Sequence, residues 1–157
     1  MKSIGSWLIV LLFVSVFAGC KKGDNYDADK QLEVDEKVIT DFLASKNITN
    51  AVRHSSGVYY IISNPGTGNI TYQGNTKIRV NYTGKLLNGN VFDSNTSYEE
   101  FLGGLIVGWQ IGIPLIQVGG KIRLLIPSVY AYGPSARTSI PANSVLDFEI
   151  ELINVSF

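Results

Sequence analysis

Few side chains in this sequence have the types and spacing needed for covalent or metal chemistry. The chain has one histidine, His54, and one cysteine, Cys20, which excludes a His/Cys metal cluster and an intrachain disulfide. A carboxylate-only metal site stays open, although no spacing of acidic residues indicates one. The glycine-containing loop at 64–68 lacks the Lys-Ser/Thr ending of a phosphate-binding loop. We therefore expect no metal ion and no cofactor.

The most informative stretch, residues 81–94, predicts two strands joined by a tight turn. Over 77–82, apolar residues alternate with charged or polar ones, which indicates a strand with one buried face. Asn88-Gly89 favours a hairpin turn whose two central residues both have φ > 0. Just after this turn, the sequence places an aromatic ring, Phe92, beside a carboxylate, Asp93. The hairpin is therefore the element around which we expect the site to be built.

Composition and pattern together indicate one small domain with extensions. The chain has 157 residues and a formal net charge of zero, and it lacks the basic run of a nucleic-acid-binding surface. Its glycine and aromatic content favours an all-β or α+β domain with tight turns. The short helix that we expect at 108–117 is weak because it contains Gly112 and Pro114. The other elements expected outside the hairpin are strands at 58–62 and 121–127 and a polar flap at 95–100.

The last predicted strand, 146–152, has the clearest alternation in the sequence. Its apolar residues should face the core, and Asp147, Glu149 and Glu151 should form an acidic row on the outer face. This row is expected to pair across strands with basic residues, chosen from Lys77, Arg79, Lys121 and Arg123.

The N-terminus has the pattern of a secretory signal. A lysine at position 2 precedes an apolar run at 7–17 and two small residues. The run is short for a membrane span, which needs ~20 residues. The sole cysteine, Cys20, lies at the expected cleavage point, and Phe-Ala-Gly-Cys resembles the lipobox of bacterial lipoproteins. We expect a lipoprotein signal peptide at 1–19 and lipidation of Cys20, with a plain secreted protein as the alternative.

A polar stretch and a helix follow the predicted signal. Residues 20–28 predict a flexible tether, and 29–50 predict an amphipathic helix with a connector. Asp27 or Asp29 is a candidate helix cap. The helix either packs on its own domain or mediates dimerisation, or it acts as a spacer or substrate arm. The apolar stripe of the helix consists of Leu32, Val38, Ile39, Phe42 and Leu43.

Five motifs in register resemble the FKBP-type peptidyl-prolyl isomerase family. One is the hairpin, with Val-Asn-Tyr-Thr-Gly, Asn-Gly and Val-Phe-Asp-Ser. The others are Gly-Val-Tyr-Tyr-Ile-Ile, Leu-Ile-Val-Gly-Trp, Ile-Pro-Ser-Val-Tyr-Ala-Tyr-Gly and Ile-Pro-Ala-Asn-Ser-Val-Leu-Asp-Phe-Glu-Ile-Glu-Leu. The resemblance covers about 57–155, and we expect an isomerase domain at 51–157 that folds on its own. It implies an α+β fold, in which a twisted antiparallel β-sheet wraps around one short α-helix, here preceded by an amphipathic helix.

The resemblance also implies a substrate pocket between helix and sheet, with Trp109 as its floor. The backbone N–H of Ile106 would bind a substrate carbonyl, and Asp93 would orient Tyr82. Whether Phe101 or Tyr98 occupies one wall position stays open. The implied catalytic set is Tyr82, Phe92, Asp93, Ile106, Trp109, Tyr132 and Phe148. The implied substrate-binding residues are Leu105, Phe101 and Ile140.

The function implied by the resemblance is peptidyl-prolyl cis-trans isomerisation that assists the folding of exported proteins. The expected partners are proline-containing segments of such proteins, the membrane through a lipid anchor, and a second copy through the N-terminal helix, but no nucleic acid. Lys21, rather than an aspartate, follows the cysteine, which favours the outer membrane. One alternative is a peptide-holding chaperone with little turnover, because Gln110 and Ile111 stand where the family usually has Glu. The other is a structural lipoprotein.

Overall fold

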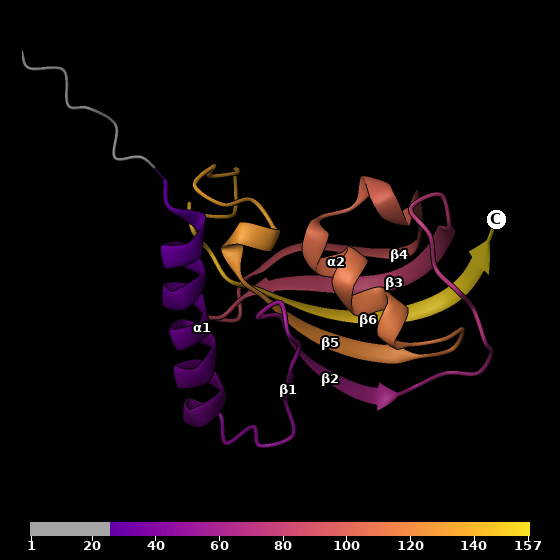
Figure 1. The fold of residues 1–157 in the computed structure, drawn as a ribbon, viewed down its shortest axis with the longest axis horizontal. Helices are drawn as coiled ribbons and strands as arrows, with labels where there is room; N and C mark the ends of the chain where they lie inside the picture. Colours follow the sequence, from indigo (N-terminus) through magenta and orange to yellow (C-terminus); the bar gives the residue numbers. More distant parts are fainter. Residues whose placement is uncertain (1–25) are drawn as a thin grey trace, which may run out of the picture.

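The computed structural model describes residues 26–157 (Figure 1). The predicted signal peptide, Cys20 and most of the predicted tether lie outside the described residues. In the part of the chain that is described, no helix is long and apolar enough to span a membrane.

Six strands form one twisted antiparallel sheet in the order β1-β2-β5-β6-β3-β4 (Figure 1). The long strands β3 and β6 pair along their whole length, which places Gly84 opposite Phe148. With the short helix α2 on one face, this is the predicted α+β fold. The strands are β1 (Val52–Arg53), β2 (Tyr59–Asn64), β3 (Lys77–Leu86), β4 (Val91–Phe101), β5 (Lys121–Ile126) and β6 (Leu146–Ser156).

Within residues 26–157, two α-helices and three short 3-10 turns accompany the sheet. Figure 1 shows α2 lying over one face of the sheet, whereas α1 stands at the end of the sheet, next to η3. The helices are α1 (Ala28–Ser45) and α2 (Val107–Gly112), and the turns are η1 (Leu102–Gly104), η2 (Ile113–Leu115) and η3 (Ser128–Tyr130).

Helix α2 is shorter than the predicted 108–117 because Pro114 lies in the 3-10 turn η2 that follows it. Proline has no N–H to continue an α-helical ladder. The glycines that weaken this helix also let it lie close to β5. A Cβ atom at Gly108 would come within 2.3 Å of Ile126, and one at Gly112 within 2.4 Å of Leu124. The same glycines therefore lower the helix propensity of α2 and allow this helix to pack closely on β5.

Strand β6 confirms the alternation predicted for 146–152, since the four apolar side chains in that range are buried. On the outer face, Asp147 accepts two hydrogen bonds from Arg123, at 2.8 and 2.7 Å. Glu151 pairs with Lys121 at 3.2 Å, as predicted, whereas Glu149 pairs with Lys85. The other two basic candidates, Lys77 and Arg79, lie near Glu99 of β4 instead.

The hairpin turn differs from the prediction of two residues with φ > 0. Gly89 has φ of 92°, but Asn88 is not left-handed. The connection covers 87–90, and the N–H of Gly89 donates to the carbonyl of Leu86 at 2.8 Å. Loops of this length need fewer left-handed residues than a two-residue turn does.

The predicted polar flap at 95–100 is wrong, because these residues belong to strand β4, which pairs with β3 as far as Phe101. A register shift occurs where Tyr82 pairs with Asn95 while Val80 pairs with Tyr98. Ser97 has φ of 63° at this bulge. A bulge re-aims the side chains that follow it, and Tyr98 packs against the core below α2.

Helix α1 packs on its own domain. Asp27 caps it by accepting a hydrogen bond from the N–H of Lys30 at 3.1 Å. Ile39 and Leu43 are buried in a cluster with Tyr59, Leu125 and Val145, on the sheet and its neighbouring loop. Of the predicted stripe, Val38 is 42% exposed. That 51–157 folds without α1 stays a prediction.

Candidate active site

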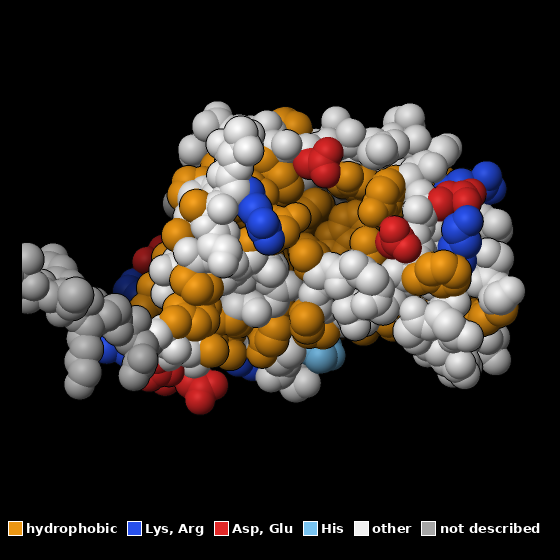
Figure 2. All heavy atoms as spheres, turned by 90° about the horizontal axis from the view of Figure 1, so that it is seen from above, with side chains coloured by type: hydrophobic (Ala, Val, Ile, Leu, Met, Phe, Trp, Pro, Cys, Tyr) orange, Lys and Arg blue, Asp and Glu red, His pale blue; other side chains and the backbone are white. Residues whose placement is uncertain are grey.

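A cavity of about 120 Å³ lies between α2 and the sheet. The space-filling view shows a hollow with an apolar floor and charged groups around its rim (Figure 2). Its lining comes from strands β3, β4 and β6, from α2 and the residues just before it, and from the loop after η3. The lining residues are Tyr82, Phe92, Asp93, Tyr98, Leu105, Ile106, Trp109, Tyr132 and Phe148.

Three aromatic rings meet the ring of Phe148 edge to face or tilted. The ring centroid of Phe148 lies 5.2 Å from that of Trp109, 5.5 Å from that of Phe92 and 6.1 Å from that of Tyr82. Gly84 makes room for this arrangement, since a Cβ there would come within 2.6 Å of Phe92 and 2.7 Å of Phe148. The cavity is therefore walled by rings that hold one another in place.

Tyr82 and Asp93 form the polar pair of the cavity. The phenolic O–H of Tyr82 donates to Oδ2 of Asp93 at 2.6 Å. Burial of the ring and, next, this hydrogen bond raise the pKa of Tyr82 well above its ordinary value. A phenol is already protonated at physiological pH, the raised pKa strengthens this, and the hydrogen bond to Asp93 fixes the direction of the O–H.

The indole N–H of Trp109 and the backbone N–H of Ile106 have no acceptor within the described chain. The indole N–H of Trp109 is buried and unpaired. Ile106 precedes α2, and its carbonyl accepts from the N–H groups of Trp109 and Gln110, but its own N–H donates to no described group. The side chain of Gln110 donates to the carbonyl of Leu105 at 2.7 Å and holds this segment. An N–H beside an apolar cavity is suited to bind a ligand carbonyl.

A second cavity of about 280 Å³ adjoins the first and shares Phe92, Asp93 and Tyr132 with it. Arg137 and Ile140 line its outer part. The guanidinium of Arg137 lies 5.1 Å from the centre of the Tyr132 ring. Tyr132 thus stands between the two cavities.

The structure brings together most of the residues that the sequence singled out. Ile140 lines the second cavity rather than the first. Phe101 lines neither cavity and is 51% exposed, whereas Tyr98 lines the first. Of these two candidates, Tyr98 is the one that lines the cavity, and its role as the wall residue stays a prediction. All other predicted catalytic and substrate-binding residues line the first cavity, and their roles stay predictions.

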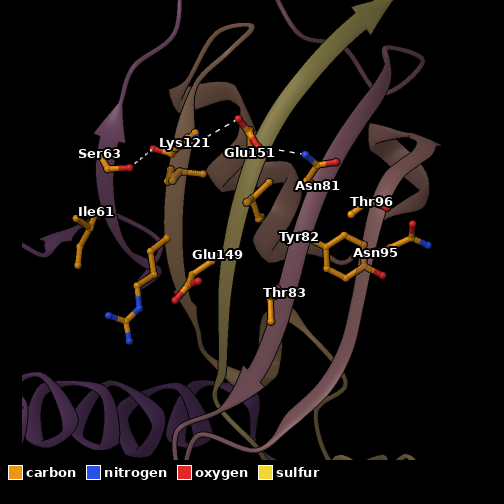
Figure 3. Close-up of a pocket in the computed structure, with 13 residues that line it drawn as sticks. Ile61, Ser63, Asn81, Tyr82, Thr83, Asn95, Thr96, Lys121, Glu149 and Glu151 are labelled. Atoms are coloured by element: carbon orange, nitrogen blue, oxygen red, sulfur yellow. Dashed lines mark hydrogen bonds and ion pairs between the residues drawn. The ribbon is translucent and has the colours of Figure 1, made fainter.

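A larger cavity, of about 510 Å³, lies on the opposite face of the sheet. Figure 3 shows that its charged and polar side chains interact with one another, with Glu151 between Lys121 and Asn81. Residues 26–157 contain no group of His, Cys, Asp and Glu side chains that could hold a metal ion. The aromatic cavity is therefore the better candidate for an active site.

Known proteins share this fold and sequence pattern. FkpA, an FKBP-type peptidyl-prolyl cis-trans isomerase of Buchnera aphidicola subsp. Schizaphis graminum, is 44% identical over 107 residues, which cover 64% of this chain and 42% of that protein. FK506-binding protein 4 of Saccharomyces cerevisiae is 45% identical over 85 residues, covering 51% and 22% of the two chains. This chain spans less than half the length of these curated relatives.

Solved structures agree with these matches. The crystal structure of FkpA from Escherichia coli has a TM-score of 0.70 and 30% identity, over 82% of this chain and 62% of that one. A peptidyl-prolyl cis-trans isomerase from Pseudomonas syringae has a TM-score of 0.68 and 30% identity, over 86% and 100% of the two chains. The model of the FKBP-type peptidyl-prolyl cis-trans isomerase family matches residues 68–153, more than half of the chain. This chain therefore belongs to the FKBP-type peptidyl-prolyl cis-trans isomerase family.

Proposed function

We propose that the chain is a peptidyl-prolyl cis-trans isomerase and that the cavity between α2 and the sheet is its active site. The observation that carries the proposal is the combination of an aromatic cavity with the Tyr82–Asp93 hydrogen bond, inside the segment that matches the family. The proposed substrates are proline-containing segments of exported proteins.

Isomerisation of an X–Pro bond needs no nucleophile. Amide resonance sets a rotation barrier of ~18–20 kcal/mol and places negative charge on the carbonyl oxygen. Twisting the bond removes this charge separation, so the transition state is less polar than the ground state. A dry, apolar cavity therefore favours the twisted amide relative to water.

Most of the residues that line the cavity have a role in this proposal. Trp109, Phe92 and Phe148 hold the proline ring on the floor and walls. The unpaired N–H of Ile106, together with Tyr132, binds a neighbouring carbonyl of the substrate. Asp93 orients Tyr82 through the 2.6 Å hydrogen bond. The second cavity extends the groove along which the substrate chain would lie.

The proposed activity is tested by the refolding of a protein whose slow phase is limited by prolyl isomerisation. Catalytic amounts of the full-length chain should accelerate that phase. The second candidate, a peptide-holding chaperone, is favoured by Gln110 and Ile111 of α2, which stand where the family usually has Glu, and by the adjoining second cavity. It predicts binding of the unfolded protein at stoichiometric amounts, with no acceleration of the slow phase.

Membrane attachment through lipidated Cys20 is part of the proposal, with the outer membrane as the expected location. The lipobox-like ending before Cys20 supports it. Stable anchoring takes two hydrophobic signals, and a lipoprotein terminus carries more than one acyl chain. Replacing Cys20 by serine should move the protein from the membrane fraction to the soluble fraction on cell fractionation. Unchanged membrane association of the Cys20→Ser protein contradicts the anchor.

A second copy bound through α1 stays a prediction. Val34 and Val38 are 51% and 42% exposed on this helix. They border a groove that also includes Leu87 and Pro141, so a homodimer would cover apolar side chains that the monomer leaves in water.

A further inference from the structure

Asp35 of α1 is a carboxylate in the interior of the protein, with 1% of its surface exposed. Its Oδ2 atom accepts two hydrogen bonds from Ser128, one from the backbone N–H at 2.7 Å and one from the hydroxyl at 2.6 Å. Its Oδ1 atom accepts from the side chain of Gln31 at 2.8 Å. The two elements joined by this contact, α1 and η3, lie 93 positions apart in the sequence.

Ser128 controls the turn that presents Tyr132 to the cavity. Its carbonyl accepts hydrogen bonds from the N–H of Ala131 at 2.9 Å and from the N–H of Gly133 at 2.8 Å. These two residues flank Tyr132 on either side. Ser128 is fully buried. Its carbonyl closes the turn, while its N–H and its hydroxyl donate to Asp35.

Packing alone does not account for a carboxylate at this position. Ile39 and Leu43, one and two turns further along the same face, are apolar and bury α1 against the sheet. A buried charge is unfavourable unless it is hydrogen-bonded, and here every hydrogen bond of Oδ2 goes to Ser128. The contact also joins a helix outside the segment that matches the family, 68–153, to a turn inside it.

We propose that Asp35 is a positioning residue for the isomerisation, because it fixes through Ser128 the turn that holds Tyr132 against the substrate. The inference rests on the proposed function for its catalytic consequence. The N-terminal helix then contributes to the active site without lining it.

The test compares carboxylate variants of α1 in the full-length chain. Asp35→Ala should lower kcat/KM for an X–Pro peptide about tenfold or more, since small misplacements of substrate-binding groups cost up to ~100-fold. Asp35→Asn keeps an acceptor oxygen and should recover most of this loss. Asp41→Ala is the matched control, because its carboxylate is 66% exposed and pairs only with Lys37, and it should leave kcat/KM unchanged.

Three further variants separate positioning from stability. Leu43→Ala weakens the packing of α1 without touching Ser128, so it should lower Tm but not kcat/KM measured well below Tm. In a Tyr132→Phe background, Asp35→Ala should add little further loss if its effect passes through Tyr132. If Asp35→Ala does not fold, Ser128→Ala removes only the hydroxyl and should give a smaller loss of the same kind.

Amide hydrogen exchange provides a readout that does not depend on activity. The amides of Ala131 and Gly133 should exchange faster in Asp35→Ala than in Asp41→Ala. Equal exchange and equal kcat/KM in these two variants would overturn the inference and leave the proposed function standing. If the wild-type chain isomerises no peptide, the proposed function fails, and the exchange of these two amides alone decides whether Asp35 fixes the turn.

Discussion

Replacement of Phe148 by alanine should lower the free energy of unfolding by about 3–5 kcal/mol, the usual cost of removing a buried phenylalanine ring. Phe148 is 4% exposed, and its ring contacts those of Trp109 and Phe92, with centroids at 5.2 and 5.5 Å. The substitution opens the wall of the cavity as well as the core. Chemical unfolding of the full-length variant measures the effect, and the isomerase rate should fall with it.

Phe101→Ala is the matched control for this prediction. It removes the same ring from a residue that is 51% exposed and lies outside both cavities. Its cost should stay below about 1 kcal/mol, because little apolar surface is returned to water. Equal destabilisation by the two substitutions would show that the Phe148 ring is not packed in the core.

Replacing Asp93 by alanine should differ from Phe148→Ala, because it should lower the isomerisation rate strongly and the stability only slightly. The carboxylate is exposed, so losing its hydrogen bond should cost about 1 kcal/mol of stability. The rate should fall about tenfold to a hundredfold, because the Tyr82 hydroxyl loses the acceptor that orients it at 2.6 Å. A phenol with the ordinary pKa of about 10 is already protonated at neutral pH, and the pKa of Tyr82 is raised above that value, so the loss should be the same across neutral pH.

Glu99→Ala controls for the loss of a carboxylate from the same strand. Glu99 is exposed and pairs with Lys77 at 2.8 Å, and exposed ion pairs contribute about 0–1 kcal/mol. The isomerisation rate of the Glu99→Ala variant should equal that of the wild-type chain. Full activity of Asp93→Ala on every X–Pro peptide would remove the Tyr82–Asp93 pair from the mechanism.

The sequence predicted the parts of this site that depend on local pattern. The alternation along β6 identified Phe148 as an inward-facing residue, and the hairpin pattern placed Phe92 and Asp93 at the start of β4. The resemblance of five motifs to one family predicted that Trp109 and Tyr132 line the same cavity, and both residues do line it. These features follow from strand periodicity and from turn residues, both of which are encoded over short stretches.

The features that the sequence did not predict depend on partners far away in the chain. Tyr98 reaches the cavity because β4 continues through a bulge whose register is set by pairing with β3. The apolar stripe predicted for α1 does not include Asp35, although this residue lies four positions before Ile39 and is buried on the same face. Besides one hydrogen bond from Gln31, that buried carboxylate accepts two from Ser128, 93 positions away in the sequence, and no local pattern predicts the contact with Ser128.

The central claim is that the cavity around Trp109 isomerises X–Pro bonds. Exchange NMR of a short X–Pro peptide tests it directly, because uncatalysed cis-trans exchange takes tens to hundreds of seconds at 25 °C. Catalytic amounts of the full-length chain should bring the exchange into the range of seconds or faster. Trp109→Leu, which keeps much of the apolar volume but changes the floor, should lose most of this acceleration, while Phe101→Ala should keep it. Exchange that is no faster with the wild-type chain than in buffer, on every X–Pro peptide tried, would contradict the claim.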